Sequence, residues 1–324
     1  MGSFFLSRWR RKPAASKELT EVLRSLDEET EEVRARQNRT GETDILETGK
    51  VETPELGPLA KLPPFKPVII SLLRLFDRED VTVSELARRV EADPALVSEL
   101  LALVNSPRYG VQGKVATASH AITMLGLDRT QSVVTTLAVR AMMANAPRTS
   151  VVRRFWMHGV ASAAIANEVA QDFGVPRDLA HVAAIVHDLG RMGLLSAHTQ
   201  EYTRLALTAH ETLQEILDAE QEQFGMDHCR AGLLLAQAWG LPEILQKAIA
   251  DHHAAPAGRN LPSLVQFCCR MADAFMFQSI IHRGAQKPAE TIQFDAPEEL
   301  REVLIDDAAA IQVRVIDTIQ SLDF

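Results

Sequence analysis

Apolar positions from Phe65 onward recur at the spacing of helices, and short polar stretches separate the helical segments. No segment alternates apolar and polar residues in the period of a β-strand, so the pattern predicts an all-α fold. The helices that we expect cover residues 94–104, 117–125, 129–144, 151–173, 178–195, 201–224, 228–239, 242–253 and 261–282.

Capping signals support several of these helix ends. Thr82 followed by Glu85 has the spacing of a capping box, and Asp93-Pro94 combines an N-cap residue with a proline at the first helical position. Glycines stand where C-terminal caps are expected, at Gly174, Gly225 and Gly240. The agreement of periodicity and caps predicts a continuous series of helices.

The chain divides into three parts by composition. Residues 1–61 are predicted to form an exposed helix over Lys17–Gln37 and a linker poor in large apolar residues. Residues 62–283 form the main domain, with a boundary near Pro147 between an N-terminal lobe (62–147) and a second lobe (148–283). Residues 284–324 are a C-terminal extension.

Composition and charge exclude some functions. The 324 residues carry a net charge of −9, which repels nucleic acid over most of the surface. Residues 82–105 have the outline of a helix-turn-helix, but their second helix, Pro94–Val104, contains no Lys or Arg to contact phosphate or bases. We therefore expect no nucleic-acid partner, and no apolar run reaches the roughly 20 residues of a transmembrane segment.

Cysteine usage indicates a reducing compartment. The cysteines are Cys229, Cys268 and Cys269, and the last two are adjacent, so no disulfide framework is implied. We expect a cytoplasmic protein in which these thiols pack as small apolar residues.

The second lobe contains a series of side chains that bind metals in proteins. A single histidine on a helix is more often a hydrogen-bonded structural residue than a ligand, so the series matters more than any member. Imidazole and carboxylate together suit one or two ions of iron, manganese, nickel or zinc. The candidate ligands are His158, His187, Asp188, His228, His252, His253 and Asp273.

Asp188 is the strongest of these candidate ligands, because it follows the apolar run from Ala183 to Val186. A carboxylate that packs at the end of such a run loses its water, which costs several kcal/mol unless a cation or strong donors replace it. An adjacent His-Asp pair can hold one metal ion and bridge to a second. The alternative is a hydrogen-bonded network of the same residues without a metal.

The order His158, His187-Asp188, Asp273 resembles the H…HD…D signature of the HD superfamily. The run "EQEQFGMDHCRAGLLLAQAWGLPEILQKAIADHH" and the earlier segments "LARRVEADPALVSELLALVNSPRYG" and "ASHAITMLGLDRTQSVV" resemble the HDOD family specifically. The resemblance implies a two-lobed helical bundle with an HD-like second lobe, and a regulatory role in bacterial signal transduction.

The chain is more distantly similar to the HD-GYP phosphodiesterases, whose ligand order implies metal-binding roles for all seven residues above. It departs from them in two places: no Gly-Tyr-Pro segment follows His253, and Arg191 stands where those enzymes carry a lysine. Arginine presents a planar fork rather than a compact charge, so its contact with a phosphate differs.

Two functions follow from these residues. The first is a regulatory HDOD protein that acts on signalling proteins, with or without a bound metal. The second is a metal-dependent phosphohydrolase or cyclic-dinucleotide phosphodiesterase, in which Asp188 and Arg191 act on a phosphate ligand. An open coordination position beside a phosphate-sized cleft favours the second function, and a site filled by side chains favours the first.

Overall fold

The computed structural model describes residues 56–59, 61–78, 80–106, 114–144, 146–147, 149–254 and 258–320. Across these residues the protein is helical, and its only strand-like feature is an isolated bridge between His210 and His282. The all-α prediction is confirmed. The helix expected at Lys17–Gln37 and most of the linker after it lie outside the described residues. The end of the predicted linker is a correction: residues 56–59 form a short helix, and Leu59 is buried in the core.

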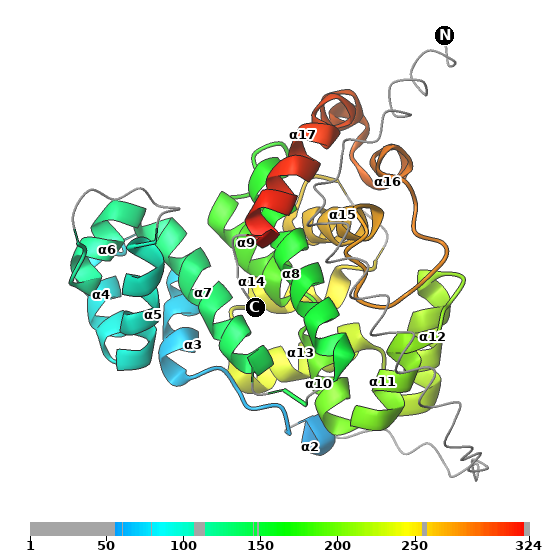
Figure 1. Cartoon of the computed structure of the whole chain (residues 1–324), viewed down its shortest axis with the longest axis horizontal. Coiled ribbons are helices and arrows are strands. Elements are labelled where there is room, and N and C mark those ends of the chain that lie inside the picture. Colours follow the sequence, from blue (N-terminus) through cyan, green and yellow to red (C-terminus); the bar gives the residue numbers. More distant parts are fainter. Residues whose placement is uncertain are drawn as a thin grey trace.

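The N-terminal group of helices stands beside the main body of the molecule (Figure 1). It contains α3 (Pro67–Leu73), η2 (Arg74–Asp77), α4 (Val83–Glu91), α5 (Pro94–Val104), α6 (Ala118–Leu125) and α7 (Leu127–Ala144). The preceding short helix, α2 (Leu56–Leu59), lies instead against the main body (Figure 1). α7 packs against both α3 and α9, so it joins this group to the second one.

Two expected caps are present in this group. The Asp93 side chain accepts hydrogen bonds from the backbone N–H groups of Ala95 and Leu96. Thr82 accepts from the Glu85 N–H, but the Glu85 carboxylate pairs with Arg78 and Arg89 instead of completing a capping box.

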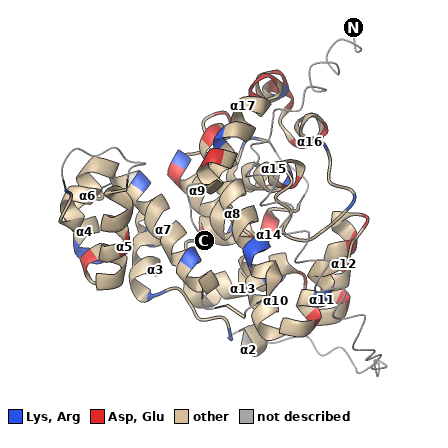
Figure 2. Cartoon of the chain, in the orientation of Figure 1, with Lys and Arg blue, Asp and Glu red and all other residues tan. Residues whose placement is uncertain are grey.

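The second group surrounds α8 (Ser150–Val169), most of whose side chains are buried. The group continues through α9 (Arg177–Val186), α10 (Leu189–Ala197), α11 (Thr199–Leu207), α12 (Leu213–Phe224), α13 (His228–Trp239), α14 (Glu243–Asp251) and α15 (Leu261–Ala274). α8, α10 and α13 carry few charged positions (Figure 2), as expected for helices in the centre of a bundle.

Two of the predicted helices are each divided into two shorter ones. The helix predicted over 178–195 breaks at His187-Asp188, which separates α9 from α10. The helix predicted over 201–224 breaks between α11 and α12, where the side chain of Thr212 begins a new helix by accepting from the Glu215 N–H. Neither break contains a proline or glycine, and apolar periodicity alone does not reveal such a break.

The helix predicted over 261–282 ends at Ala274. Met276 adopts the left-handed conformation with φ of 73°, and the Phe277 N–H bonds to the Ala272 carbonyl in the manner of a helix C-cap. This position is normally glycine, so the sequence carries no signal for it. The turn brings the Phe277 carbonyl back toward α8.

The C-terminal residues form α16 (Pro288–Asp295), η4 (Glu298–Leu300) and α17 (Arg301–Gln320). α16 packs on α15, and α17 packs along α8. The predicted extension therefore covers the second group of helices directly. None of the helices in the described part of the chain is long and apolar enough to cross a membrane.

α10 and α13 cross at close range because glycines face each other. A Cβ atom on Gly190 would lie 1.8 Å from the His228 carbonyl oxygen and 2.6 Å from the Gly232 backbone nitrogen. This contact places the break at Asp188 directly beside the first turn of α13. The crossing therefore sets the distance between two of the predicted ligands.

Candidate metal centre

Four separate segments bring the predicted histidines together. His158 lies in the middle of α8, His187 and Asp188 form the break between α9 and α10, and His228 begins α13. His252 and His253 follow the last residue of α14. All of these side chains except that of His253 are buried, and His253 is half-buried.

The Nδ1 atoms of three of these histidines, His158, His187 and His252, are held by hydrogen bonds to fixed acceptors. Nδ1 of His158 lies 2.7 Å from the Phe277 carbonyl oxygen, that of His187 lies 2.6 Å from the Ala184 oxygen, and that of His252 lies 2.7 Å from the Ile249 oxygen. A carbonyl only accepts, so each Nδ1 carries the hydrogen. This arrangement fixes the tautomer and leaves the lone pair on Nε2, as in histidines that bind metals.

Four of the Nε2 atoms form two close pairs. Nε2 of His158 lies 3.3 Å from Nε2 of His187, and Nε2 of His228 lies 3.1 Å from Nε2 of His253. Two imidazole nitrogens on one metal ion at about 2.0–2.1 Å lie roughly 2.9–3.4 Å apart for octahedral or tetrahedral angles. Both observed separations fall in this range.

The Asp188 carboxylate lies between these two pairs of histidines. Its Oδ2 is 3.7 Å from Nε2 of both His158 and His187, and its Oδ1 is 3.5 Å from Nε2 of His228 and 3.6 Å from Nε2 of His252. These distances exceed a hydrogen bond. Neither oxygen of this buried carboxylate accepts a hydrogen bond, although Oδ2 forms an ion pair with Arg191, so the observed side chains fit a further cation among the histidines.

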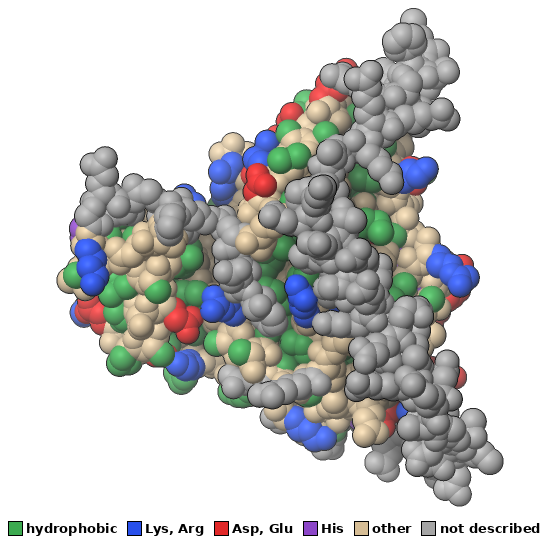
Figure 3. Space-filling view, viewed as in Figure 1, with side chains coloured by type: hydrophobic (Ala, Val, Ile, Leu, Met, Phe, Trp, Pro, Cys, Tyr) green, Lys and Arg blue, Asp and Glu red, His purple; other side chains and the backbone are tan. Residues whose placement is uncertain are grey.

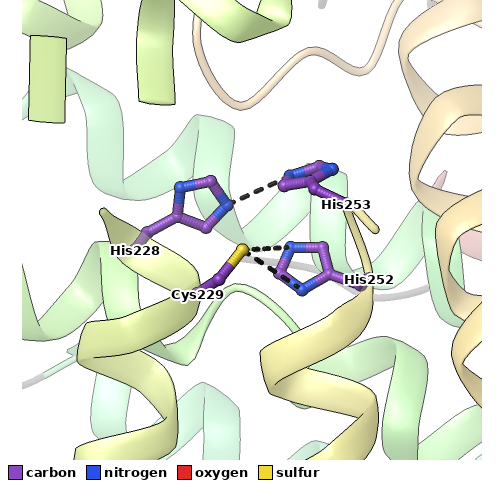
Figure 4. A group of neighbouring side chains, drawn as sticks. All are labelled: His228, Cys229, His252 and His253. Atoms are coloured by element: carbon purple, nitrogen blue, oxygen red, sulfur yellow. Dashed lines mark hydrogen bonds between the residues drawn. The ribbon is translucent and has the colours of Figure 1, made fainter. Parts of the chain in front are cut away.

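Two cysteines complete the arrangement. Cys269 Sγ lies 3.5 Å from Nε2 of His158, and Cys229 Sγ lies 3.8 Å from Nδ1 of His252. We call His158, His187 and Cys269 the first ligand group, and His228, Cys229, His252 and His253 the second ligand group. Figure 4 shows the second group, with side chains from α13 and from the end of α14 facing one another.

The prediction that all three thiols pack as small apolar residues therefore fits only Cys268, which is fully buried in the hydrophobic core. Cys229 and Cys269 instead lie against the histidines. Both occupy positions next to, or one turn from, a predicted ligand, and this proximity in the sequence indicated a place at the centre more correctly than the preference for apolar packing did.

The charges in the centre shift its pKa values in both directions. Burial lowers the pKa of His228 and of His252, but Glu220 and Cys229 outweigh burial and raise these values to about 10 and about 9, so a metal ion would have to displace a proton from each. Burial opposes ionisation of Asp188, but the guanidinium of Arg191 and the nearby histidines outweigh it and hold the pKa of the carboxyl well below its usual range. Burial lowers the pKa of His187 to about 3, so this imidazole is neutral at physiological pH. Burial raises the pKa of the Cys229 thiol, yet His252 and His228 outweigh burial and bring it down to about 6.

A buried polar network holds the second ligand group in place. Glu220, in α12, accepts hydrogen bonds from Nδ1 of His228 at 2.6 Å, from Arg191 at 2.9 Å and from the Tyr202 hydroxyl at 2.6 Å. Sequence reasoning missed Glu220, although it stands between Ile216 and Phe224 on the buried face of its helix. A carboxylate four residues from each of two apolar positions on one helix face indicates a buried acidic group, and this pattern identifies Glu220 in the sequence.

Arg191 and Asp273 lie differently from the roles that the sequence suggested. Arg191 is buried between Asp188, whose Oδ2 is 3.0 Å from Nε, and Glu220, so its guanidinium is held by protein carboxylates. Asp273 lies behind His158: its Oδ1 is 3.5 Å from the Nδ1 of His158, and its Oδ2 is 3.0 Å from Nε2 of His282. It lies on the Nδ1 side of the His158 ring, whereas Asp188 lies on the Nε2 side.

Access to the centre is narrow. The pocket that reaches it is lined by His253, Cys269, Asp273 and His282 and has a volume of about 20 Å³. That is roughly the space of one water molecule. Asp188 is not among the side chains that line this pocket.

Comparison with known proteins assigns the family. Residues 62–255 match the sequence profile of the HDOD domain, which covers more than half of the chain. The chain belongs to the HDOD family. A Treponema pallidum (strain Nichols) protein described as uncharacterized is 25% identical over 199 residues, which are 60% of this chain and 38% of that protein.

Solved structures share the HDOD fold with this chain. An HDOD domain protein of unknown function from Geobacter sulfurreducens matches with a TM-score of 0.62 and 20% identity over 79% of this chain and 93% of that one. A protein from Marinobacter aquaeolei VT8, named for signal transduction, matches with a TM-score of 0.63 and 18% identity over 84% and 62%. One from Shewanella amazonensis SB2B, named as a metal-dependent phosphohydrolase, matches with a TM-score of 0.54 and 15% identity over 82% and 95%.

Proposed function

We propose that this HDOD protein is a metal-binding regulatory module that acts on signalling proteins and does not turn over a substrate. The observation that carries the proposal is Asp188, a buried carboxylate without hydrogen-bond partners that faces the Nε2 atoms of four histidines. The Arg191 guanidinium pairs with this carboxylate from one side, 3.0 Å from Oδ2, and a metal ion would satisfy it on the side of the histidines. The observed donors therefore favour a bound metal over a purely hydrogen-bonded network.

The two ligand groups would hold one ion each, with Asp188 between them. Iron, manganese, nickel and zinc all accept imidazole and carboxylate, and the thiols of Cys229 and Cys269 favour zinc and iron among them. When bound, such ions supply positive charge that joins α8, α10, α13 and the end of α14. The metal would thereby stabilise the second group of helices in one arrangement.

The surroundings of the centre favour regulation over hydrolysis. A phosphohydrolase needs a cleft that admits its substrate, whereas the pocket here has a volume of about 20 Å³. Arg191, the candidate for phosphate binding, already pairs with Asp188 and Glu220. The HDOD family and a structural neighbour named for signal transduction agree with a regulatory role.

One observation favours the second candidate, a metal-dependent phosphohydrolase or cyclic-dinucleotide phosphodiesterase. Two ligand groups that share one carboxylate are the arrangement with which paired metal ions clamp a phosphate. A structural neighbour also carries the name of a metal-dependent phosphohydrolase. This function requires the centre to open, and an activity assay separates it from the first.

The first experiment measures metal content by elemental mass spectrometry in the wild type and in the His187→Ala and Asp188→Ala variants. The matched control is His120→Ala, because His120 is exposed on α6, away from both ligand groups. We expect about one to two equivalents of metal in the wild type and the control, and loss from both site variants. A wild type that stays metal-free after anaerobic reconstitution would contradict the proposal.

The second experiment incubates the metal-loaded protein with bis(4-nitrophenyl) phosphate and with cyclic di-GMP. We expect no hydrolysis above that of the Asp188→Ala variant. Hydrolysis that follows the metal content and disappears in Asp188→Ala would replace the regulatory proposal with the phosphohydrolase.

A further inference from the structure

A second cavity lies between the two groups of helices, away from the metal centre. Its volume is about 570 Å³, within the range of small-molecule sites, and no metal-centre side chain lines it. Its walls come from the α6–α7 junction, from α8 and α9, and from α17. In the space-filling view the N-terminal group projects from one side of the main body (Figure 3).

One side of the cavity is an ordered chain of neutral polar groups. The Thr136 hydroxyl donates to the Ser132 carbonyl oxygen, so it accepts a hydrogen bond from Nε2 of His181 at 2.9 Å. The Asn167 amide donates to Nδ1 of His181 at 2.9 Å. This chain fixes the tautomer of His181 and the orientation of the amide before any ligand arrives.

The cavity also gathers positive charge in a chain whose net charge is −9. Its lining includes four arginines, Arg129, Arg140, Arg177 and Arg314, against two carboxylates, Glu168 and Asp178. Glu168 is paired with Arg314 at 2.7 Å, and Asp178 accepts a hydrogen bond from Ser132 at 3.0 Å. The carboxylates are therefore engaged by protein groups, and a positive excess remains.

Arg140 and Arg177 both line the cavity and come from different helices. Arg140 belongs to α7 and Arg177 begins α9, and both are exposed. Within the described part of the chain, neither side chain forms an ion pair. Guanidinium groups of this kind bind phosphate and carboxylate oxygens in pairs.

The remaining walls are apolar. Trp156, which is buried in α8, lines the cavity together with Leu103, Leu127 and Leu137. An inorganic anion would leave this surface uncovered, and an uncharged apolar compound would leave the arginines unused. The lining as a whole fits a molecule that combines both properties.

We propose that this cavity binds a small organic anion, in which a phosphate or carboxylate group is attached to an apolar or planar body. The anionic group meets Arg140 and Arg177, and the body lies against Trp156 and the leucines. Such a ligand touches α7, α8, α9 and α17 at once. Its binding therefore fixes the N-terminal group of helices relative to the second group.

The test is isothermal titration calorimetry on the full chain with two probes, adenosine 5′-monophosphate for a phosphate on a planar body and octanoate for a carboxylate on an apolar chain. Adenosine and inorganic phosphate are the matched half-ligands. We expect at least one probe to bind with a Kd below about 1 mM, and both of its halves to bind at least about tenfold more weakly.

The variant that tests the location is Arg140→Gln combined with Arg177→Gln, two exposed positions where the change does not disturb the core. We expect it to weaken binding at least about tenfold. The control is Arg88→Gln, an exposed helical arginine outside the cavity, which should bind as the wild type does. Failure of both probes to bind, or equal binding by the double variant, would overturn the proposal.

Discussion

Replacing Gly190 by alanine tests whether the crossing of α10 and α13 holds the metal centre together. The new Cβ would lie 1.8 Å from the His228 carbonyl oxygen, whereas real Cβ atoms essentially never approach within 3.0 Å. The two helices must therefore separate by at least about 1.2 Å, because the atom in contact is backbone and cannot rotate away. His228 moves with its own backbone, so its distance to Asp188 grows as well.

The expected loss of stability is about 3 kcal/mol or more, which exceeds ordinary overpacking of a side chain. A displacement above about 0.5 Å is also enough to disturb a metal site, so metal content should fall with stability. The assays are urea unfolding followed by circular dichroism, and elemental mass spectrometry of the folded fraction.

The matched control is Gly159→Ala, a buried helical glycine in α8 next to His158. A Cβ at Gly159 would lie 3.5 Å from the Ile185 carbonyl oxygen, which is an ordinary contact. We expect this variant to keep its metal and to change stability by less than about 1 kcal/mol. Equal behaviour of the two variants would refute the reasoning about the helix crossing.

Three further predictions follow from the contacts around the two sites. Glu220→Gln replaces the carboxylate that accepts a hydrogen bond from Nδ1 of His228. We expect its metal affinity, measured by competition titration with a chelator, to fall about 10- to 100-fold, and an unchanged affinity would show that Glu220 does not support the metal centre. Cys229→Ser should weaken metal binding while Cys268→Ser should not, and equal effects would show that the thiol of Cys229 is not a ligand. Burial lowers the pKa of His181 to about 4, below the ordinary value of 6.5, so the unfolded chain binds more protons between these pH values. We therefore expect the free energy of unfolding of the wild type, compared with that of His181→Gln, to be highest above pH 6.5 and to fall by about 2 kcal/mol toward pH 4. This is less than the full pKa shift would give, because the ring is partly exposed. Urea unfolding at several pH values measures the difference between the two proteins, and a difference that does not change with pH would contradict the prediction.

Local sequence signals predicted much of this fold. The apolar spacing and the caps at Asp93 and Gly225 located helix ends that the structure confirms. The candidate ligands could also be identified from the sequence, because Asp188 ends an apolar run that a charged group would otherwise avoid. The burial of Asp188 that this position predicted is observed.

Features that depend on long-range packing could not be predicted. The break at His187-Asp188 has no proline or glycine signal, and the two residues serve the site only because the glycine contact brings α13 against α10. The orientation of His158 depends on the Phe277 carbonyl, 119 residues away in the chain. The narrowness of the centre and the cavity between the helix groups likewise exist only after distant helices pack.

The central claim is that a metal ion lies among the Nε2 atoms around Asp188. The most direct measurement is anomalous X-ray diffraction from crystals of the protein, with data collected above and below the absorption edge of the metal found by elemental analysis. The account predicts an anomalous peak between Asp188 and the histidines of at least one ligand group. A peak at another place, or none in crystals of protein reconstituted with metal under anaerobic conditions, would contradict it.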